Sequence, residues 1–149
     1  MKKIILRPLI FLIIISCTLE SKFGLPNDEN INPELIGIWF DGKNHNEYVK
    51  IEKSGEKRYK LSLNDSTKLV SYSSKVKGFT ILNVITNYKG KNTNSFYGIE
   101  FKKDTLKFSE VNNNLRKTDF NSQSELIDFF NENINNQEFF INPVNLIRK

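Results

Sequence analysis

Apolar and polar residues alternate along most of the chain, so that one face of each short stretch is apolar. These faces hold Val49 and Ile51; Tyr59, Leu61 and Leu63; Val70, Tyr72 and Val76; Tyr97, Ile99 and Phe101; and Leu106 and Phe108. A period of two is typical of half-buried antiparallel strands. Turn-forming pairs such as Ser54-Gly55, Lys77-Gly78 and Lys89-Gly90 separate the stretches. The pattern predicts a mainly β fold, an antiparallel meander that closes as a small barrel or forms a strongly curved sheet.

The stretch FTILNVITNY, residues 79–88, is apolar on both faces and therefore needs cover outside as well as inside. Residues 122–134, SQSELIDFFNENI, supply that cover. Ser122 and Glu125 have the spacing of a capping box, and the apolar residues after them have helical spacing. We expect one C-terminal α-helix over about 122–134, lying across the outer surface near residues 79–88. The stretch NPVNLIRK then predicts a last short strand with Pro143 at its start.

The first 16 residues have the layout of a secretory signal, with a positive start, an apolar run from Leu9 to Ile15 and a small residue after it. The run is too short to cross a membrane, which takes about 20 apolar residues. Residues 18–33 include two prolines, one glycine and several polar residues, and this composition is typical of a tether. We therefore expect a signal peptide at 1–16, a modified cysteine with a flexible tether at 17–33, and a single β-barrel-like domain at 34–149.

The residues Ile14-Ile15-Ser16-Cys17 resemble the lipobox of bacterial lipoproteins, although leucine is usual where Ile14 stands. The resemblance implies a cleaved chain that begins at Cys17, with a diacylglyceryl group on the thiol and an acyl chain, such as palmitate, on the new amine. Two or three acyl chains hold a domain at a membrane almost permanently, because each buried methylene contributes about 0.8 kcal/mol. The implied location is the bacterial cell envelope, and Thr18 in place of an aspartate favours the outer membrane over the inner. An ordinary cleaved signal with an incidental cysteine is the alternative.

Gly37 and Trp39, in ELIGIWF, resemble the start of lipocalins and related calycin barrels. In those families the glycine lets the chain bend, and the tryptophan plugs the closed end of the barrel beneath a basic residue from a late strand. The resemblance implies that Arg148, or failing that Lys149, is this basic residue, an arrangement worth about 0.5–2 kcal/mol. A core tryptophan on an unrelated small β fold is the alternative. The pattern indicates roughly seven strands before the helix, whereas a standard lipocalin has eight strands and commonly disulfides.

The net charge adds little to this interpretation. The whole chain has a net charge of +5, and loss of Lys2, Lys3 and Arg7 with the signal leaves about +2. No block of like charges remains, so a nucleic-acid partner is not expected. Because Cys17 is the only cysteine, the domain has no disulfide.

Candidate catalytic chemistry is sparse. The one histidine, His45, lies near Asp41 and Glu47 in a polar loop, and the spacing matches no standard metal site. The chain has no Gly-x-Ser-x-Gly elbow and no glycine-rich phosphate loop. We expect no enzyme, no cofactor and no metal, although a mechanism that uses only carboxylates stays open because paired acids meet only in space.

Two roles fit these features, and we expect a monomer in both. The first is a binding module for an apolar or amphipathic small ligand, lined by Tyr59, Leu61, Tyr72, Tyr97, Ile99, Phe101 and Phe108. The second is an envelope interaction, inhibitor or accessory lipoprotein with a filled barrel core, whose outer surface or open strand edge meets another protein. The strand number does not decide between the two roles, because the interior of a barrel of about eight strands is either filled by side chains or holds one small ligand.

Overall fold

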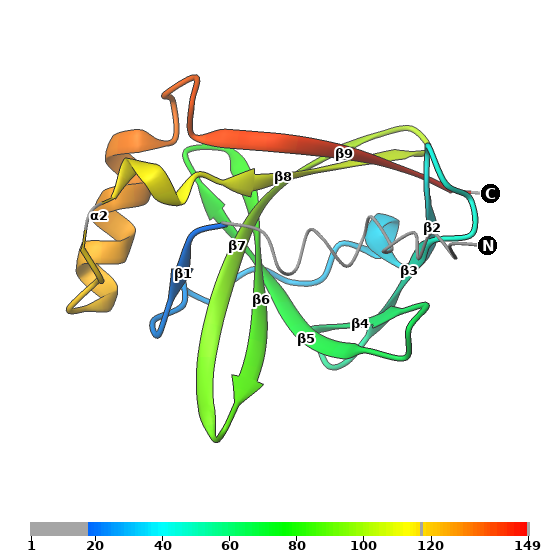
Figure 1. The fold of residues 1–149 in the computed structure, drawn as a ribbon, viewed down its shortest axis with the longest axis horizontal. Coiled ribbons are helices and arrows are strands. Elements are labelled where there is room, and N and C mark those ends of the chain that lie inside the picture. The colour runs from blue at the N-terminus through cyan, green and yellow to red at the C-terminus, as the bar shows by residue number, and fades with distance from the viewer. Residues whose placement is uncertain (1–17, 117, 149) are drawn as a thin grey trace, which may run out of the picture.

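The computed structural model describes residues 18–116 and 118–148 of the chain (Figure 1). Eight strands form a closed antiparallel barrel in which each strand pairs with the next along the chain. They are β2 (Gly37–Asp41), β3 (Tyr48–Lys53), β4 (Tyr59–Leu63), β5 (Lys68–Val76), β6 (Phe79–Tyr88), β7 (Lys91–Lys102), β8 (Thr105–Val111) and β9 (Phe140–Arg148). The ring closes because β9 pairs with both β8 and β2. The expected barrel-forming meander is confirmed.

The strands enclose one apolar core and support a second on the outside. The inner core takes residues from every barrel strand, among them Trp39, Val49, Leu61, Leu82, Val84, Ile99, Phe108 and Leu146. Leu82 and Val84 of β6 point inside, whereas Ile81 belongs to the outer core. The prediction that residues 79–88 need cover on both faces is therefore confirmed.

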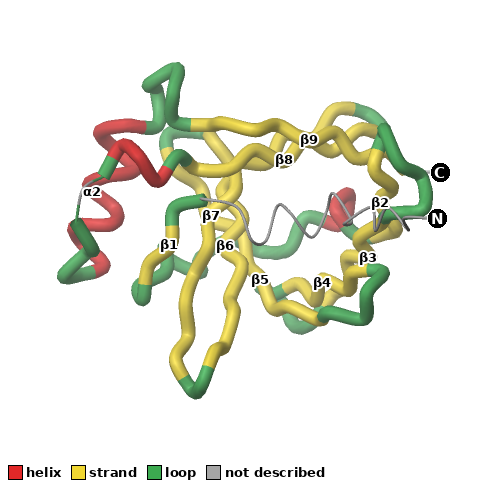
Figure 2. Tube along the Cα trace, in the orientation of Figure 1, coloured by secondary structure: helices red, strands yellow, loops and turns green. Residues whose placement is uncertain are grey.

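The helix α2 (Gln123–Asn133) covers the outer core and stands at one side of the barrel (Figures 1 and 2). Its Phe130 ring lies 5.3 Å from the Phe96 ring of β7, edge to face. Ser122 caps the helix, since its hydroxyl accepts from the Glu125 amide at 3.1 Å. The Glu125 carboxylate accepts from the Asn121 amide, one residue before the cap, so the box is shifted by one position. The expected helix and its place are confirmed.

No helix in the described ranges is long and apolar enough to cross a membrane.

The described segment before Glu34, from Thr18 on, is packed against the barrel, so the flexible tether expected over 17–33 is wrong for residues 18–33, and Cys17 lies outside the described residues. Leu19 and Leu25 are buried in the outer core. The Leu19 amide donates to the Val111 carbonyl at 2.8 Å, and the Leu19 carbonyl accepts from the Phe96 amide. The short strand β1 (Glu20–Ser21) pairs with β7 next to this point. The segment thus lies between β7 and β8 where they diverge, and the residues from Thr18 onward belong to the folded domain.

The last strand is longer than expected, and Pro143 lies inside it instead of at its start. Asn142 and Pro143 together lie opposite the single residue Ser109 of β8, between the pairs Glu110–Ile141 and Phe108–Val144. A bulge of this kind leaves one residue out of the ladder, so the missing N–H of proline costs no strand hydrogen bond.

Candidate functional site

Trp39 closes one end of the barrel, which we call the closed end. Its ring is fully buried, and Nε1 donates to the Leu35 carbonyl at 2.9 Å. The Arg148 guanidinium lies 4.4 Å from the centre of the indole and donates to the Glu34 carbonyl. Gly37 has φ +147°, in the region that favours glycine, and a side chain there would meet the guanidinium. The structure therefore brings Gly37, Trp39 and Arg148 together, and Lys149 lies outside the described residues.

The chain leading into β2 crosses this closed end. The Ser74 hydroxyl donates to the Pro26 carbonyl at 2.7 Å, and the Asn32 amide donates to the Tyr59 hydroxyl at 2.6 Å. A short 3₁₀ helix, η1 (Pro33–Leu35), follows and buries Leu35 against the inner core. These bonds hold residues 26–35 as a cover over one mouth of the barrel.

The residues expected to line a ligand all face the interior except Tyr72. The inward set is Tyr59, Leu61, Tyr97, Ile99, Phe101 and Phe108. Tyr72 pairs with Asn83 of β6 on the outer face, and its hydroxyl donates to the Leu25 carbonyl at 2.8 Å. Its inward placement was wrong because the N-terminal segment covers the outer face of β5. Ser71 and Ser73 point inside in its place.

A small hollow lies between this cover and the inner core, with a volume of about 110 Å³. Its floor is apolar and its rim is mostly polar. The floor consists of Leu35, Ile99, Phe101 and Leu106. The rim consists of Glu29, Asn30, Asn32, Ser73, Lys75 and Thr80. Pockets for drug-sized ligands take about 300–1,000 Å³. A larger ligand at this end therefore requires residues 26–32 to move.

Buried carboxylates also face the interior on the side away from the closed end, which we call the loop end because the β2–β3 and β4–β5 connections meet there. Asp41, Glu47 and Glu110 are all buried. Asp41 pairs with Leu146, and Glu110 pairs with Tyr97, so both share a face with residues of the inner core. Burial raises the pKa of the Tyr97 phenol, and the charges of Glu110 and Glu20 raise it further. Acidic groups thus join the apolar side chains of the interior on the side of the loop end.

The predicted ligand lining did not include these acidic groups. Asp41 and Glu47 were candidates only as metal ligands with His45, which is exposed. A signal was present, because Asp41 and Glu110 continue the inward period of Trp39 and of Leu106 and Phe108. Among the described residues, no group of three His, Cys, Asp or Glu side chains is arranged to hold a metal ion.

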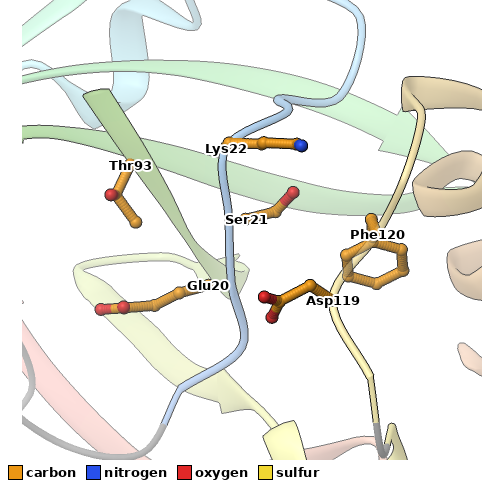
Figure 3. Close-up of a pocket in the computed structure, with 6 residues that line it drawn as sticks. All are labelled: Glu20, Ser21, Lys22, Thr93, Asp119 and Phe120. Atoms are coloured by element: carbon orange, nitrogen blue, oxygen red, sulfur yellow. The ribbon is translucent and has the colours of Figure 1, made fainter. Parts of the chain in front are cut away.

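Two further hollows lie away from the closed end. One, of about 230 Å³, separates β1 from the loop before α2, and Figure 3 shows the Phe120 ring on its far wall. Its polar groups include the exposed side chains Glu20, Lys22 and Asp119. The other, of about 270 Å³, is lined by Asp41, Gly42, Lys43, Pro143, Val144 and Asn145, at the β2–β9 seam of the loop end.

Cys17 and the signal at 1–16 lie outside the described residues, so the lipid anchor stays a prediction. Comparisons of the chain with protein-family models, with curated proteins and with solved structures gave no match.

Proposed function

We propose that this chain is a lipid-anchored protein of the bacterial cell envelope, held at Cys17, whose barrel binds an apolar or amphipathic small ligand without catalysing a reaction. The observation that supports binding is the closed eight-stranded barrel with an aromatic and aliphatic interior. Barrels of this size are wide enough to hold one small ligand. A mixed apolar and polar interior suits a ligand with a tail and a head group.

Ligand binding is tested by titrating the purified protein with fatty acids and fatty alcohols while following the fluorescence of Trp39, the only tryptophan. Trp39 reports on the interior because its ring contacts Phe101 at 5.8 Å, edge to face. We expect a saturable spectral change and a higher melting temperature, since a ligand at 100 times its Kd stabilises by about 2.7 kcal/mol. No change with any ligand would refute the binding role.

A pair of matched variants shows whether the ligand enters the barrel. Ile99→Phe adds bulk to an inward side chain that lines the closed-end hollow. Ile38→Phe adds the same bulk to an exposed side chain of β2. We expect the first to weaken binding and the second to leave it unchanged, with both melting temperatures recorded. Equal binding by the two variants would place the ligand away from the closed-end hollow.

The anchor is tested with Cys17→Ser. We expect loss of metabolic palmitate labelling and release of the protein from the membrane fraction, which we propose is the outer membrane. Unchanged labelling and fractionation would refute the lipid anchor. The proposed ligand binding would not be affected by this result.

Docking to another envelope protein is the second candidate, and the β6–β7 hairpin favours it. Among the described strands, residues 86–93 pair only with one another, because β5 pairs with β6 no further than Ile85 and β1 pairs with β7 no further than Asn94. The hairpin extends away from the barrel, and Tyr88 near its tip is 72% exposed (Figure 2). Crosslinking in native membranes, with Tyr88→Ser as the comparison, tests this role. One partner that is lost in the variant supports it, and a crosslinking pattern without any partner contradicts it.

A further inference from the structure

We infer that the barrel takes a cationic amphiphile, a primary amine on an apolar tail, with the ammonium group beside Asp41 at the loop end and the tail against Val144 and the inner core. This inference rests on the proposed binding function and names the class of its ligand.

Asp41 is the group that carries the inference. The residue is only 1% exposed, although a carboxylate is ordinarily charged at neutral pH. One oxygen, Oδ1, accepts from the Lys43 amide at 2.7 Å. The other, Oδ2, is buried and has no hydrogen-bond partner in residues 18–116 and 118–148. Asp41 also forms no ion pair with a described lysine or arginine. A charge buried in this way is costly unless a donor or cation meets it.

The carboxylate also lies next to space that a ligand can fill. Asp41 lines the hollow of about 270 Å³ at the β2–β9 seam, together with Gly42, Lys43, Pro143, Val144 and Asn145. Lys43 is exposed and forms no ion pair with Asp41 among the described residues. Val144 packs in turn against the inner core, so a ligand whose head group stays at Asp41 can place its tail on apolar side chains.

Ser71 gives a second and independent indication. Its residue is fully buried on β5, and its hydroxyl is unpaired within the described part of the chain. Ser71 pairs with Tyr59 on one side and Val84 on the other, both residues of the inner core, so the hydroxyl faces the interior. Buried hydroxyls are ordinarily hydrogen-bonded. The interior thus offers a second polar group for a bound molecule.

The sign of the charge follows from the inward-facing groups of the loop end. Asp41 and Glu110 face the interior there, and the pKa of Tyr97 is raised in part by the charges of Glu110 and Glu20. A carboxylate head group would add a like charge at this end, whereas an ammonium brings three donors and the opposite charge. A neutral alcohol brings one donor and no charge.

The test compares decylamine, decanol and decanoate, which share a tail length and differ in the head group. Binding of each to the purified protein is measured by Trp39 fluorescence and by calorimetry at pH 7. We expect decylamine to bind at least about tenfold more tightly than decanol, because charge-assisted hydrogen bonds are roughly twice as strong as neutral ones. Decanoate should bind weakest.

Two variants test whether Asp41 causes the preference for decylamine. Asp41→Asn keeps an oxygen for the Lys43 amide and removes the charge. Glu100→Gln removes a charge from an exposed side chain of β7, whose neighbours Ile99 and Phe101 point inward. We expect Asp41→Asn to weaken decylamine binding about tenfold or more with little change for decanol, and Glu100→Gln to change neither.

The outcomes are distinguishable. Equal binding of all three ligands, or a preference for decanoate, would overturn the amine inference and leave the binding function intact. An amine preference that persists in Asp41→Asn would overturn the assignment to Asp41. No binding of any ligand would overturn the proposed binding function itself, and the ligand series on the unaltered protein gives this answer even where a variant fails to fold.

Discussion

Leu19 provides the sharpest test of how the N-terminal segment is held. Its side chain is 1% exposed and packs in the outer core under α2. Leu19→Ala removes three carbon atoms, a transfer cost of about 2.4 kcal/mol at about 0.8 kcal/mol for each methylene. The cavity left behind adds to this, and buried leucine-to-alanine changes cost about 2–5 kcal/mol in all. The same leucine-to-alanine change in a flexible tether would leave the free energy of unfolding almost unchanged.

The assay is urea denaturation followed by circular dichroism, with thermal denaturation as a second measure. For a domain of this size we expect Leu19→Ala to lower the melting temperature by roughly 6–15 °C, at roughly 3 °C per kcal/mol. Lys22→Ala is the matched control, because Lys22 lies in the same segment and is exposed. A loss below about 0.5 kcal/mol for Leu19→Ala, the range of ordinary surface changes, would refute the packed segment.

Three other changes probe the rest of the fold. Gly98→Ala should cost about 1–3 kcal/mol in thermal denaturation, because its Cβ would lie 2.4 Å from the Phe140 ring; stability that does not return on adding Phe140→Leu would contradict that contact. Ser122→Ala should cost about 1 kcal/mol through loss of the helix cap, and an unchanged urea midpoint would argue against it. The pKa of Tyr97 is raised in the folded protein, so the free energy of unfolding should fall as pH rises above about 10. Tyr97→Phe should reduce that fall and the exposed Tyr88→Phe should not, as measured by urea denaturation from pH 7 to 11.

The barrel was predictable because local pattern and global fold agree along most strands. Tyr59, Leu61 and Leu63 alternate with polar residues and all three face the inner core. The helix was equally predictable, since Ser122 marks its start and the apolar face of the helix is continuous. The resemblance of Gly37 and Trp39 to the start of lipocalins predicted that Trp39 closes one end of the barrel.

The N-terminal segment had only a short pattern of its own. Leu19, Phe23 and Leu25 share the odd positions, with Glu20 and Lys22 between them, but the glycine and prolines of the segment favoured a tether. Their burial depends on a gap between β7 and β8 and on the outer core formed by α2. Tyr72 was misplaced for the same reason, since the cover over its face comes from a part of the chain 47 residues away.

The acidic loop end was hidden by chain distance as well. Asp41 and Glu110 belong to strands that are far apart in sequence, and only closure of the barrel through β9 brings both onto its inner face. Their inward period could be read from the sequence. The unpaired oxygen of Asp41, which carries the inference about the ligand, depends on where Lys43 and Asn145 fold and has no local signal.

Closure of the ring is the claim on which the interior, the closed end and the ligand site all depend. The most direct measurement is the set of nuclear Overhauser contacts between the backbones of β2 and β9 in a labelled sample. The account predicts contacts between Trp39 and Arg148, Phe40 and Ile147, and Asp41 and Leu146. Strong contacts between β2 and β3 with none between β2 and β9 would describe an open sheet and contradict it.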